Sequence, residues 1–482
     1  MSEFETIIGL EVHVELLTKT KLFCSCSTAF GAEPNTQVCP ICLGLPGEII
    51  PVLNRKALEY AIKAALALNC DITDVIDFDR KNYFYADLPK GYQRSQFFNP
   101  MGTNGYVEIE VGGSTKRIGI KQLHLEEDAG KLLHTGDDII TSPFSLVDFN
   151  RAGVPLIEIV TEPDIRSAEE ARLFLQELRN ILRYIAISDC KLEEGSMRAD
   201  ANVSLRPLGS NKFGNKTELK NMNSFRSVFN GIEYEVKRQS KILREGGEVL
   251  PETRHWDEDK GVTKGMRSKF ASADYRCFPD ANFLPYELST DWIEKLKDSL
   301  PELPLARRRR LMDEYGLPAY DAEVLTSSRE LADYYDATLR FSPAPKVVSN
   351  WVMGEILRLL KAAEIEITEC KITPENLAEL LRLIEKGEIS GKIAKEVLEE
   401  MSTTGEKAES IVQRKGLAQI SDEDTLRKLA IEVIAANPRS VEDYRSGKKK
   451  AIGFLVGQIM RKTKGKANPQ LVNKVLEEEL NK

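Results

Sequence analysis

The amino-acid sequence predicts an α+β protein in which an antiparallel-sheet-rich N-terminal domain precedes all-α domains. Up to about residue 290, short segments alternate apolar and polar residues, which is the period of a strand. After Thr290 the apolar residues recur every three to four positions, which is the period of a helix. The length of 482 residues indicates roughly three domains of about 150 residues. We expect domains at residues 1–292, 293–402 and 403–482, with a polar, flexible break at residues 402–405.

The strands of the first domain are predicted from six segments of strict alternation. They are LEVHVEL, YVEIEV, KRIGIKQLHL, PLIEIV, SMRADANVSLRP and KTELKN. Alternation of this kind is typical of strands with one buried face, and the Gly, Asn and Pro clusters between the segments mark turns. An antiparallel sheet with attached helices is therefore the simplest arrangement for this region.

Two helices are expected to interrupt these strands. One spans about residues 168–185 behind Ser167, and Glu170 three residues later completes a capping box. The other spans about residues 225–245 and ends at a Gly-Gly pair. In the last third of the chain, NLAELLRLIEKG and TLRKLAIEVIAANP have helical spacing, and no strand is predicted there.

The composition indicates a globular, cytoplasmic protein. Hydrophobic residues make up 42% and charged residues 29%, which is ordinary for a globular chain. No apolar run approaches the ~20 residues that a membrane helix needs. The first residues, MSEFETIIGLEVHVEL, carry acids where a signal peptide needs a basic start. The cytoplasm is reducing, and this disfavours disulfides between the eight cysteines.

Charge is unevenly distributed along the chain. The net charge of −8 by itself discourages a nucleic-acid partner, but residues 402–482 hold 16 Lys and Arg against 11 Asp and Glu. Their net charge of +5 leaves −13 for the remainder. The basic residues that flank an apolar segment of this tail are Lys448, Lys449, Lys450, Arg461, Lys462, Lys464 and Lys466. Such a cluster is either a solvated face or a phosphate-binding surface.

Four cysteines lie within nineteen residues, from Cys24 to Cys42. A CxC pair, Cys24 and Cys26, is followed after twelve residues by a CxxC pair, Cys39 and Cys42. Two such knuckles supply four thiolates, which is typical of a closed structural zinc site. A thioredoxin-like redox pair fits less well because no βαβ pattern surrounds the CxxC, and reduced, metal-free thiols remain the alternative. The other four cysteines are expected to be small buried hydrophobic residues.

The polar faces of the predicted strands carry candidate metal ligands. In GLEVHVEL, alternation buries the apolar residues and leaves Glu11, His13 and Glu15 together on the opposite face. HLEEDAGK adds Glu126 and Glu127, followed by a third acid. Consecutive acids repel one another unless water or a metal neutralises them, and oxygen-rich sites of this kind suit Mg²⁺. Solvated strand faces remain the alternative.

A third strand has an unusually polar face. SMRADANVSLRP places Arg198, Asp200 and Asn202, followed by Ser204 and Arg206, on one side and apolar residues on the other. This density of polar groups exceeds what solubility requires. By contrast, GSNKFGNKT is not a phosphate-binding loop of the type GxxxxGK[ST], because an extra asparagine separates the second glycine from the lysine and a strand follows.

Ordered motifs along the chain resemble one protein family. They are IGLEVHVEL, KLFCSCS, CPICLGLPG, RKNYFYADLPKGYQ, HLEEDAGK, DFNRAGVPLIEIVTEPD, GSMRADANVSLRP and TELKNMNSF. The helical remainder is similar to the family's helical and tail domains. On these residues the chain is identified as a member of the B subunits of the bacterial-type aspartyl/glutamyl-tRNA(Asn/Gln) amidotransferases, the GatB family. The related archaeal E subunit carries a large inserted domain, for which this sequence has no room.

The resemblance implies a carbon–nitrogen ligase of protein biosynthesis. In this family an amidase A subunit releases ammonia, which travels to the B subunit, and a small C subunit completes the heterotrimer. The B subunit uses ATP and Mg²⁺ to phosphorylate the side-chain carboxylate of Glu-tRNA(Gln) or Asp-tRNA(Asn), and ammonia then displaces the phosphate. This chain lacks the Gly/Ser-rich segment of the amidase, so its ammonia has to come from a partner. Either tRNA or both remain open as the substrate.

The resemblance also assigns residues. The magnesium ligands would be Glu11, His13, Glu126 and Glu127. Lys81 and Lys90 match lysines of the family's polar ammonia path, although a basic loop face is the alternative. Tyr83 and Tyr85 would stack on adenine or on the acceptor end of tRNA, or else are core aromatics. The remaining polar residues of this pocket would be Arg198, Asp200 and Asn202. The basic tail is similar to a module that docks on the outer corner of tRNA through phosphate contacts.

Two functions of other classes remain open. A zinc-stabilised RNA-binding scaffold without catalysis explains the cysteines and the tail, but not the convergence of acids with His13. A metal-dependent hydrolase explains the acids, but it would act without an amidase partner. The family function instead predicts that Glu127→Ala abolishes tRNA-dependent ATP cleavage and spares tRNA binding. It also predicts that removal of residues 403–482 weakens tRNA binding far more than ATP binding.

Overall fold

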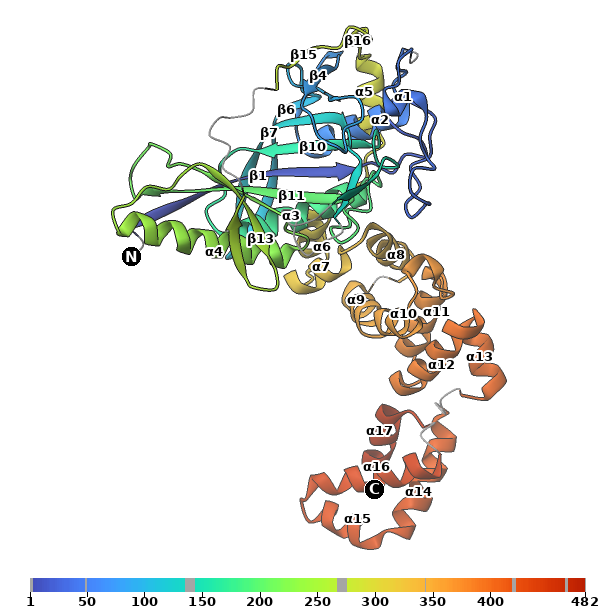
Figure 1. The fold of residues 1–482 in the computed structure, drawn as a ribbon. Coiled ribbons are helices and arrows are strands. Elements are labelled where there is room, and N and C mark those ends of the chain that lie inside the picture. Colours follow the sequence, from blue (N-terminus) through green and yellow to red (C-terminus); the bar gives the residue numbers. More distant parts are fainter. Residues whose placement is uncertain are drawn as a thin grey trace. The chain divides into compact units, whose positions relative to one another are not determined.

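The fold has a sheet-containing N-terminal part and a helical C-terminal part (Figure 1). The computed structural model describes residues 3–47, 50–134, 144–266, 275–342, 344–417, 422–463 and 467–481. They form two compact units, Met1–Leu305 and Ala306–Lys482. Every strand of these described residues belongs to the first unit, so the predicted α+β class is confirmed.

The first unit contains sixteen strands among its described residues. They are β1 (Phe4–Glu15), β2 (Asp71–Ile72), β3 (Val75–Ile76), β4 (Asp79–Asn82), β5 (Tyr92–Ser95), β6 (Gly102–Val111), β7 (Ser114–Glu127), β8 (Lys131–His134), β9 (Ser145–Asp148), β10 (Pro155–Thr161), β11 (Met197–Pro207), β12 (Thr217–Lys220), β13 (Glu252–Asp257), β14 (Val262–Gly265), β15 (Phe278–Pro279) and β16 (Tyr286–Glu287). Its helices are α1 (Pro40–Leu43), α2 (Arg55–Ala67), α3 (Ala168–Tyr184), α4 (Phe225–Arg244) and α5 (Thr290–Asp298). All six predicted strand segments are confirmed.

Nine of these strands form one large sheet in the order β14-β13-β12-β11-β1-β10-β7-β6-β2. Neighbours pair antiparallel except β12 and β13, which are parallel. A smaller sheet, β15-β4-β5, lies against the end of β7, where Gln93 of β5 donates a hydrogen bond to the Glu127 carbonyl at 2.7 Å. Strand β1 therefore lies at the centre of the large sheet, with the small sheet beside its β7 side.

The alternating pattern builds the core of the first unit. Along β1, Leu10, Val12 and Val14 are buried and pack with the apolar residues of α2, α3 and α4. Helix α3 begins as predicted, because the Ser167 side chain accepts a hydrogen bond from the Glu170 amide at 3.1 Å. The capping box is only half formed, since the Glu170 carboxylate accepts from the Arg166 amide instead. The opposite face of the sheet is left to polar side chains.

The second unit is helical, and its described residues form two hydrophobic cores, within 311–412 and 426–480. Its helices are α6 (Pro304–Tyr315), which begins at the unit boundary, α7 (Ala319–Leu325), α8 (Arg329–Leu339), α9 (Pro345–Trp351), η1 (Val352–Ile356), α10 (Leu357–Ala363), η2 (Ile367–Glu369), α11 (Pro374–Glu385), α12 (Gly391–Thr404), α13 (Ala408–Lys415), α14 (Glu423–Ala436), α15 (Pro438–Arg445), η3 (Lys449–Ala451), α16 (Ile452–Lys462) and α17 (Pro469–Leu480). Among the described residues, none of the helices is both long and apolar enough to cross a membrane.

The expected flexible break at residues 402–405 is wrong in its local structure. These residues end α12, and Gly405 caps the helix with a left-handed φ of 73°. Helix α13 follows and contributes Ala408 and Ile411 to the same core as α12. Glycine at a left-handed helix end is a common cap, so the polar residues mark a helix terminus here. The division into three domains stays a prediction.

Candidate functional site

The open face of the large sheet brings charged residues from four strands into one row. His13 of β1 lies opposite Glu158 of β10 on one side and Arg198 of β11 on the other. Glu158 in turn lies opposite His124 of β7. Residues directly opposite each other in antiparallel strands project from the same face. Strand register therefore builds the candidate site.

Three of these side chains converge closely enough to hold a metal ion. His13 Nε2 lies 3.6 Å from Glu158 Oε1 and 3.8 Å from Glu126 Oε1. One ligand atom from each residue lies within 4.8 Å of the other two. The second oxygen of Glu126 is buried and has no hydrogen-bond partner among the described residues. Two carboxylates, one with an unsatisfied oxygen, and an imidazole form a donor set that fits a divalent cation.

The pKa shifts of these side chains also fit the binding of a divalent cation. Burial and the nearby Glu158 carboxylate raise the pKa of Glu126 to about 7, and burial also raises the pKa of Glu158. Burial and the Arg198 charge lower the pKa of His13 to about 3, so its ring is neutral at neutral pH. Burial would lower the pKa of Lys81, but Glu126 and Glu158 raise it above its ordinary value. The pKa values of Glu126 and Glu158 stay raised although Lys81 opposes the shift, so Lys81 compensates their charge only in part and a metal ion would add to that compensation.

Glu11 lies beside this cluster and does not belong to it. Its carboxylate accepts a hydrogen bond from Asn202 Nδ2 at 3.0 Å. Asp200, opposite Glu11 on β11, instead holds Lys220 of β12 at 2.5 Å. The face that the sequence predicts for β11 is therefore confirmed. Its charges are largely paired with neighbouring side chains.

Arg198 links the cluster of His13, Glu126 and Glu158 to a second buried acid, Asp128. Its guanidinium lies 2.8 Å from Asp128 Oδ2. Burial would raise the pKa of Asp128, but Arg198 and Arg151 lower it to about 2. Burial together with Asp128 raises the pKa of Glu15 to about 8. Arg198 thus holds one acid ionised at the edge of the cluster and helps to keep His13 neutral.

Glu127 is not brought to the cluster. Its carboxylate forms a buried ion pair with Lys90, with Nζ 2.5 Å from Oε2. It also accepts a hydrogen bond from the Arg94 amide at 3.3 Å. Consecutive residues of a strand project to opposite faces, so Glu126 and Glu127 have separate surroundings. Of the four expected magnesium ligands, the structure places His13 and Glu126 together, Glu11 next to them and Glu127 elsewhere.

The tyrosines of RKNYFYADLPKGYQ have different environments. Tyr83 is half-buried, donates a hydrogen bond to Gln93 at 3.4 Å and packs edge-on against Tyr275 at 6.0 Å. Lys81 lies 5.1 Å from the centre of the same Tyr275 ring. Tyr85 is 63% exposed, so it is not a core aromatic. Tyr85 is free to contact a ligand, whereas Tyr83 contacts the same Tyr275 ring as Lys81 of strand β4.

A cavity of about 290 Å³ borders Glu11 and Asn202. Its lining includes Lys121, Lys216 and Phe213, and the last two belong to the GSNKFGNKT segment. This places two cations and an aromatic ring around the same cavity as Glu11. A larger cavity of about 1040 Å³ is lined mainly by apolar residues of segments 50–58 and 281–295, and none of the predicted site residues lines it.

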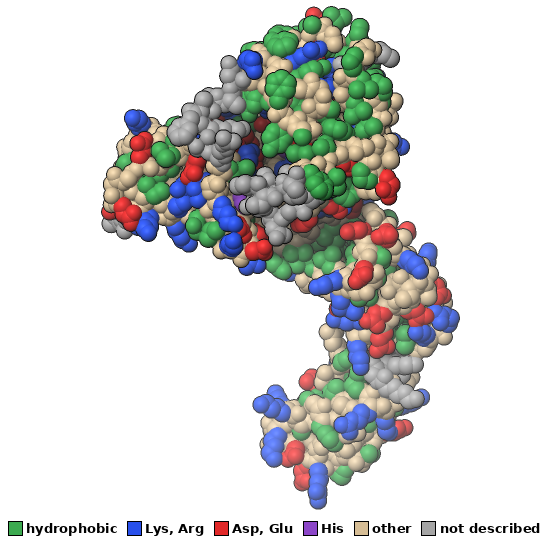
Figure 2. All heavy atoms as spheres, viewed as in Figure 1, with side chains coloured by type: hydrophobic (Ala, Val, Ile, Leu, Met, Phe, Trp, Pro, Cys, Tyr) green, Lys and Arg blue, Asp and Glu red, His purple; other side chains and the backbone are tan. Residues whose placement is uncertain are grey.

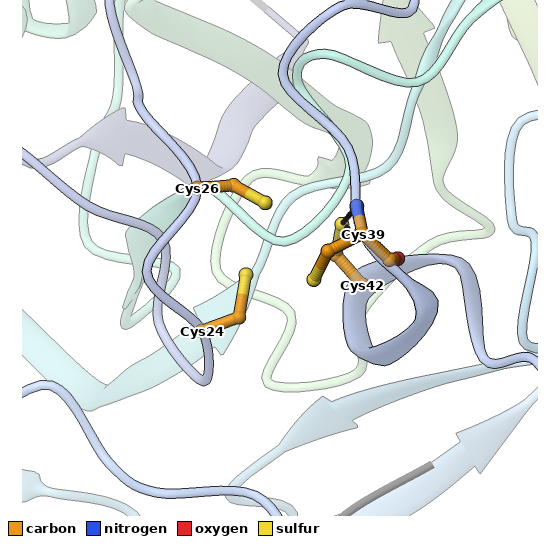
Figure 3. A group of neighbouring side chains, drawn as sticks. All are labelled: Cys24, Cys26, Cys39 and Cys42. Carbon is orange, nitrogen blue, oxygen red and sulfur yellow. Dashed lines mark hydrogen bonds between the residues drawn. The ribbon is translucent and has the colours of Figure 1, made fainter. Parts of the chain in front are cut away.

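The four clustered cysteines converge as predicted (Figure 3). Cys24 and Cys26 come from the loop after β1, and Cys39 and Cys42 from the start of α1. One sulfur of each residue lies within 4.8 Å of the other three, which fits tetrahedral binding of zinc. None of the described cysteines is in a disulfide. Of the four scattered cysteines, only Cys190 is fully buried, so the expected burial is wrong for the others.

A buried lysine supports the cysteine cluster. Lys21 is 1% exposed, and its Nζ lies 3.6 Å from Cys42 Sγ and donates to the Phe149 carbonyl at 3.2 Å. A hydrogen bond from Cys24 is the largest effect that lowers the pKa of Cys42, to about 4, and Lys21 adds to it. Cys42 is therefore a thiolate at neutral pH, the form that binds metal.

Lys and Arg side chains of the described part of the tail lie on its surface (Figure 2). Lys449, Lys450 and Arg461 are exposed, and no ion pair links them to another described residue. Lys448 is paired with Asp443 at 2.9 Å, and Lys462 is paired with Glu432 at 2.9 Å. The two remaining basic residues of the predicted cluster, Lys464 and Lys466, lie outside the described residues.

Sequence reasoning missed two residues of the site. Glu158 is the one polar residue of PLIEIV, and His124 lies between two leucines in KQLHL. The phase of the alternation shows that both face the polar side. Only the pairing of β10 with β1 and β7 shows that they lie next to His13 and Glu126.

Comparison with known proteins identifies the family of the chain. Residues 6–294 match the family model described as the GatB/GatE catalytic domain, and residues 333–480 match the GatB domain model. A relative from Carboxydothermus hydrogenoformans, named as the B subunit of an aspartyl/glutamyl-tRNA(Asn/Gln) amidotransferase, is 58% identical over 482 residues that cover both chains completely. Proteins of the same name from Moorella thermoacetica and Geobacillus thermodenitrificans are 58% and 57% identical over at least 99% of each chain. The chain belongs to the GatB family.

Proposed function

We propose that this chain is the carboxylate-activating subunit of a tRNA-dependent amidotransferase that acts in the cytoplasm. With ATP it phosphorylates the side-chain carboxylate of mischarged Glu-tRNA(Gln), Asp-tRNA(Asn) or both, and ammonia then converts the acyl phosphate to the amide. The observation that carries the proposal is the cluster of His13, Glu126 and Glu158 within the region that matches the catalytic-domain model. The relatives' shared name supports the same reaction.

His13, Glu126 and Glu158 are the residues that would hold magnesium. A magnesium ion bound there would neutralise charge that develops during phosphoryl transfer. Burial keeps the His13 ring neutral, so that a nitrogen lone pair is available as a ligand. Glu11 adds a carboxylate next to the cluster, and Asn202 holds it by a hydrogen bond. Compared with the expected ligands, this set contains Glu158 in place of Glu127 and leaves Glu11 beside the cluster.

We propose the cavity beside Glu11 as the binding site for ATP. Lys121 and Lys216 supply positive charge for phosphates, and the Phe213 ring offers an apolar surface for the base. Asn202 lines the same cavity, so it stays in the proposed pocket, with Arg198 and Asp200 on the same strand face. The exposed Tyr85 is available to the acceptor end of the tRNA.

Ammonia is proposed to come from an amidase A subunit, within a heterotrimer that also contains a small C subunit. Lys81 faces Glu126 and Glu158, which supports a polar approach to the metal cluster from the small sheet. Lys90 is paired with Glu127, so it would line the proposed ammonia path without contacting His13, Glu126 or Glu158. The ammonia then displaces phosphate, and the side chain becomes an amide.

Two further features are proposed to support this reaction. The four converging cysteines would hold a structural zinc ion, because a closed set of four thiolates leaves no open ligand position. The exposed Lys449, Lys450 and Arg461 would contact tRNA phosphates. A scaffold without catalysis is not favoured, since it gives no reason for buried acids to converge on His13.

Amide formation tests the proposal directly. The chain is combined with its A and C partners, ATP, MgCl₂ and glutamine, and supplied with Glu-tRNA(Gln) or Asp-tRNA(Asn). We expect ATP-dependent formation of glutaminyl-tRNA or asparaginyl-tRNA. Absence of amide on both tRNAs, with tRNA binding intact, would instead support the scaffold.

A further inference from the structure

The turn that carries the second pair of clustered cysteines packs directly against Lys90. This CxxC turn, residues 39–45, contains helix α1 and ends it at Gly44, whose backbone is left-handed with a φ of 66°. A Cβ atom at Gly44 would lie 2.4 Å from Lys90 Cγ and 3.2 Å from Lys90 Cα. A glycine allows both the backbone conformation and this close approach. The turn therefore lies against the stem of the lysine whose Nζ is paired with Glu127.

The same turn also lies close to Glu127. Gly153, with a φ of 86°, separates the two. A Cβ atom at Gly153 would lie 3.6 Å from Cys42 Cβ and 3.8 Å from Glu127 Oε1. The Gly153 amide donates a hydrogen bond to the Asp128 carbonyl at 2.9 Å, which holds this segment against the end of β7. Both members of the buried ion pair are therefore neighbours of the CxxC turn.

The CxxC turn is attached to the rest of the first unit through its sulfur atoms (Figure 3). Cys42 forms hydrogen bonds with Cys24 and Lys21, and Cys39 forms one with Cys26. Among the described residues, no other hydrogen bond joins the turn to a different segment. None of the residues of α1 belongs to the hydrophobic cluster that fills the core of the first unit. The state of the four sulfurs therefore decides how firmly the turn is held.

We infer that the four-cysteine site positions Lys90, and that zinc binding by the cysteines keeps the pair of Lys90 with Glu127 formed. When one ion holds the four sulfurs together, Gly44 stays against the lysine stem. Without the ion the turn is released, and Lys90 loses the wall that directs its Nζ to Glu127. The consequence for the reaction rests on the proposed function, in which Lys90 lines the ammonia path. The cysteine site then acts on the use of ammonia as well as on folding.

The first test measures how accessible the Lys90 amine is in the full-length chain. The chain is loaded with ZnCl₂ or stripped with EDTA, lysines are labelled briefly with acetic anhydride, and each site is quantified by mass spectrometry. Lys90 is 5% exposed and paired, and removal of zinc should raise its labelling rate about tenfold through local opening. Lys116 is the control, because it pairs with Glu170 at 2.6 Å at the opposite end of β7 from Glu127. Its rate should not change.

The second test uses two glycine variants in the complete complex. Gly44→Ala and Gly47→Ala both place a side chain on a left-handed backbone, with φ of 66° and 83°. Only the first meets Lys90, since nothing lies within 4 Å of a Cβ atom at Gly47. Gly44→Ala should lower the amide formed per glutamine hydrolysed about tenfold and leave tRNA-dependent ATP cleavage within about twofold of the wild type. Excess ammonium chloride should restore amide formation. Gly47→Ala should match the wild type in every value.

Two labelling results would overturn the inference, whether or not Gly44→Ala folds. An unchanged rate at Lys90 after zinc removal shows that the cysteine site does not position the lysine. Equal increases at Lys90 and Lys116 show that zinc stabilises the whole unit and has no particular effect on the pair. If Lys90 alone becomes accessible but the wild-type complex forms no amide, the coupling of the two sites stands and the proposed function fails.

Discussion

Lys90 Nζ lies 2.5 Å from Glu127 Oε2, and neither side chain is more than 5% exposed. The pair joins the loop before β5 to the end of β7, away from the cluster of His13, Glu126 and Glu158. Removing one partner of a buried pair leaves the other charge uncompensated, which is costly. The pair therefore makes Glu127 a residue whose substitution affects folding before it affects metal binding.

Glu127→Ala is accordingly expected to lower the free energy of unfolding by about 3–5 kcal/mol. The measurement is chemical unfolding of the purified chain, followed by circular dichroism. Glu59→Ala is the control, since Glu59 pairs with Lys56 at 3.1 Å on the surface and should contribute less than about 1 kcal/mol. Equal stability of Glu127→Ala and the wild type would show that the buried pair is not formed.

This result also changes how loss of activity in Glu127→Ala is interpreted. The sequence predicts that the variant abolishes ATP cleavage through the metal, but the structure gives it a partner in Lys90 instead. A destabilised variant loses activity for reasons unrelated to magnesium. Glu126 and Glu158 are the residues that separate the two effects, because their carboxylates lie at the candidate metal position.

The sequence correctly predicts which side chains point into the core for strands that bury one face. In GLEVHVEL, alternation correctly separates the buried Val12 and Val14 from the polar Glu11 and His13. The same rule separates Glu126 from Glu127, and treating them as one ligand pair disregards it. Alternation assigns a residue to a face, but it does not say which strands are neighbours. For this reason Glu158 and His124 became part of the site only through the observed register.

The cysteine cluster predicts one zinc ion per chain. Cys39→Ser should reduce the zinc content of the purified protein to near zero and lower its thermal unfolding temperature, because a structural zinc site contributes directly to folding. Zinc is measured by atomic absorption. Occupancy should also fall as the pH is lowered from about 8 to about 6, since cysteine thiols must lose protons to bind metal.

Cys370→Ser is the matched control for zinc, since Cys370 lies in the second unit and outside the cluster. It should keep the wild-type zinc content. A wild-type protein that contains no zinc, even after refolding with the metal, would assign the four cysteines to the reduced, metal-free alternative.

The exposed basic residues of the C-terminal helices lead us to expect tRNA binding that depends on salt. The combined variant Lys449→Ala, Lys450→Ala, Arg461→Ala should weaken tRNA binding and reduce the slope of log affinity against log salt by up to about 0.9 per lost phosphate contact. Filter binding at several salt concentrations measures both values. Lys474→Ala is the control, because Lys474 already lies near Glu423 and Glu478.

A deletion that tests the tail should start at a residue that leaves the hydrophobic core of residues 311–412 intact. A deletion that starts at residue 403 removes Ala408 and Ile411 from the core that α12 shares, whereas a deletion of residues 422–482 leaves that core whole. The shorter deletion should weaken tRNA binding far more than ATP binding. Equal losses of both, or an unchanged salt slope in the triple variant, would contradict a tail that binds phosphates.

The central claim is that His13, Glu126 and Glu158 form the metal site for carboxylate activation. The most direct measurement is tRNA-dependent ATP cleavage by the complete complex at increasing Mg²⁺, with the wild type, Glu126→Gln, Glu158→Gln and the surface control Glu108→Gln. We predict a loss on the order of 100-fold in both site variants, an increased Mg²⁺ requirement and unchanged tRNA affinity. ATP cleavage that persists in both variants with the wild-type Mg²⁺ dependence would contradict the account.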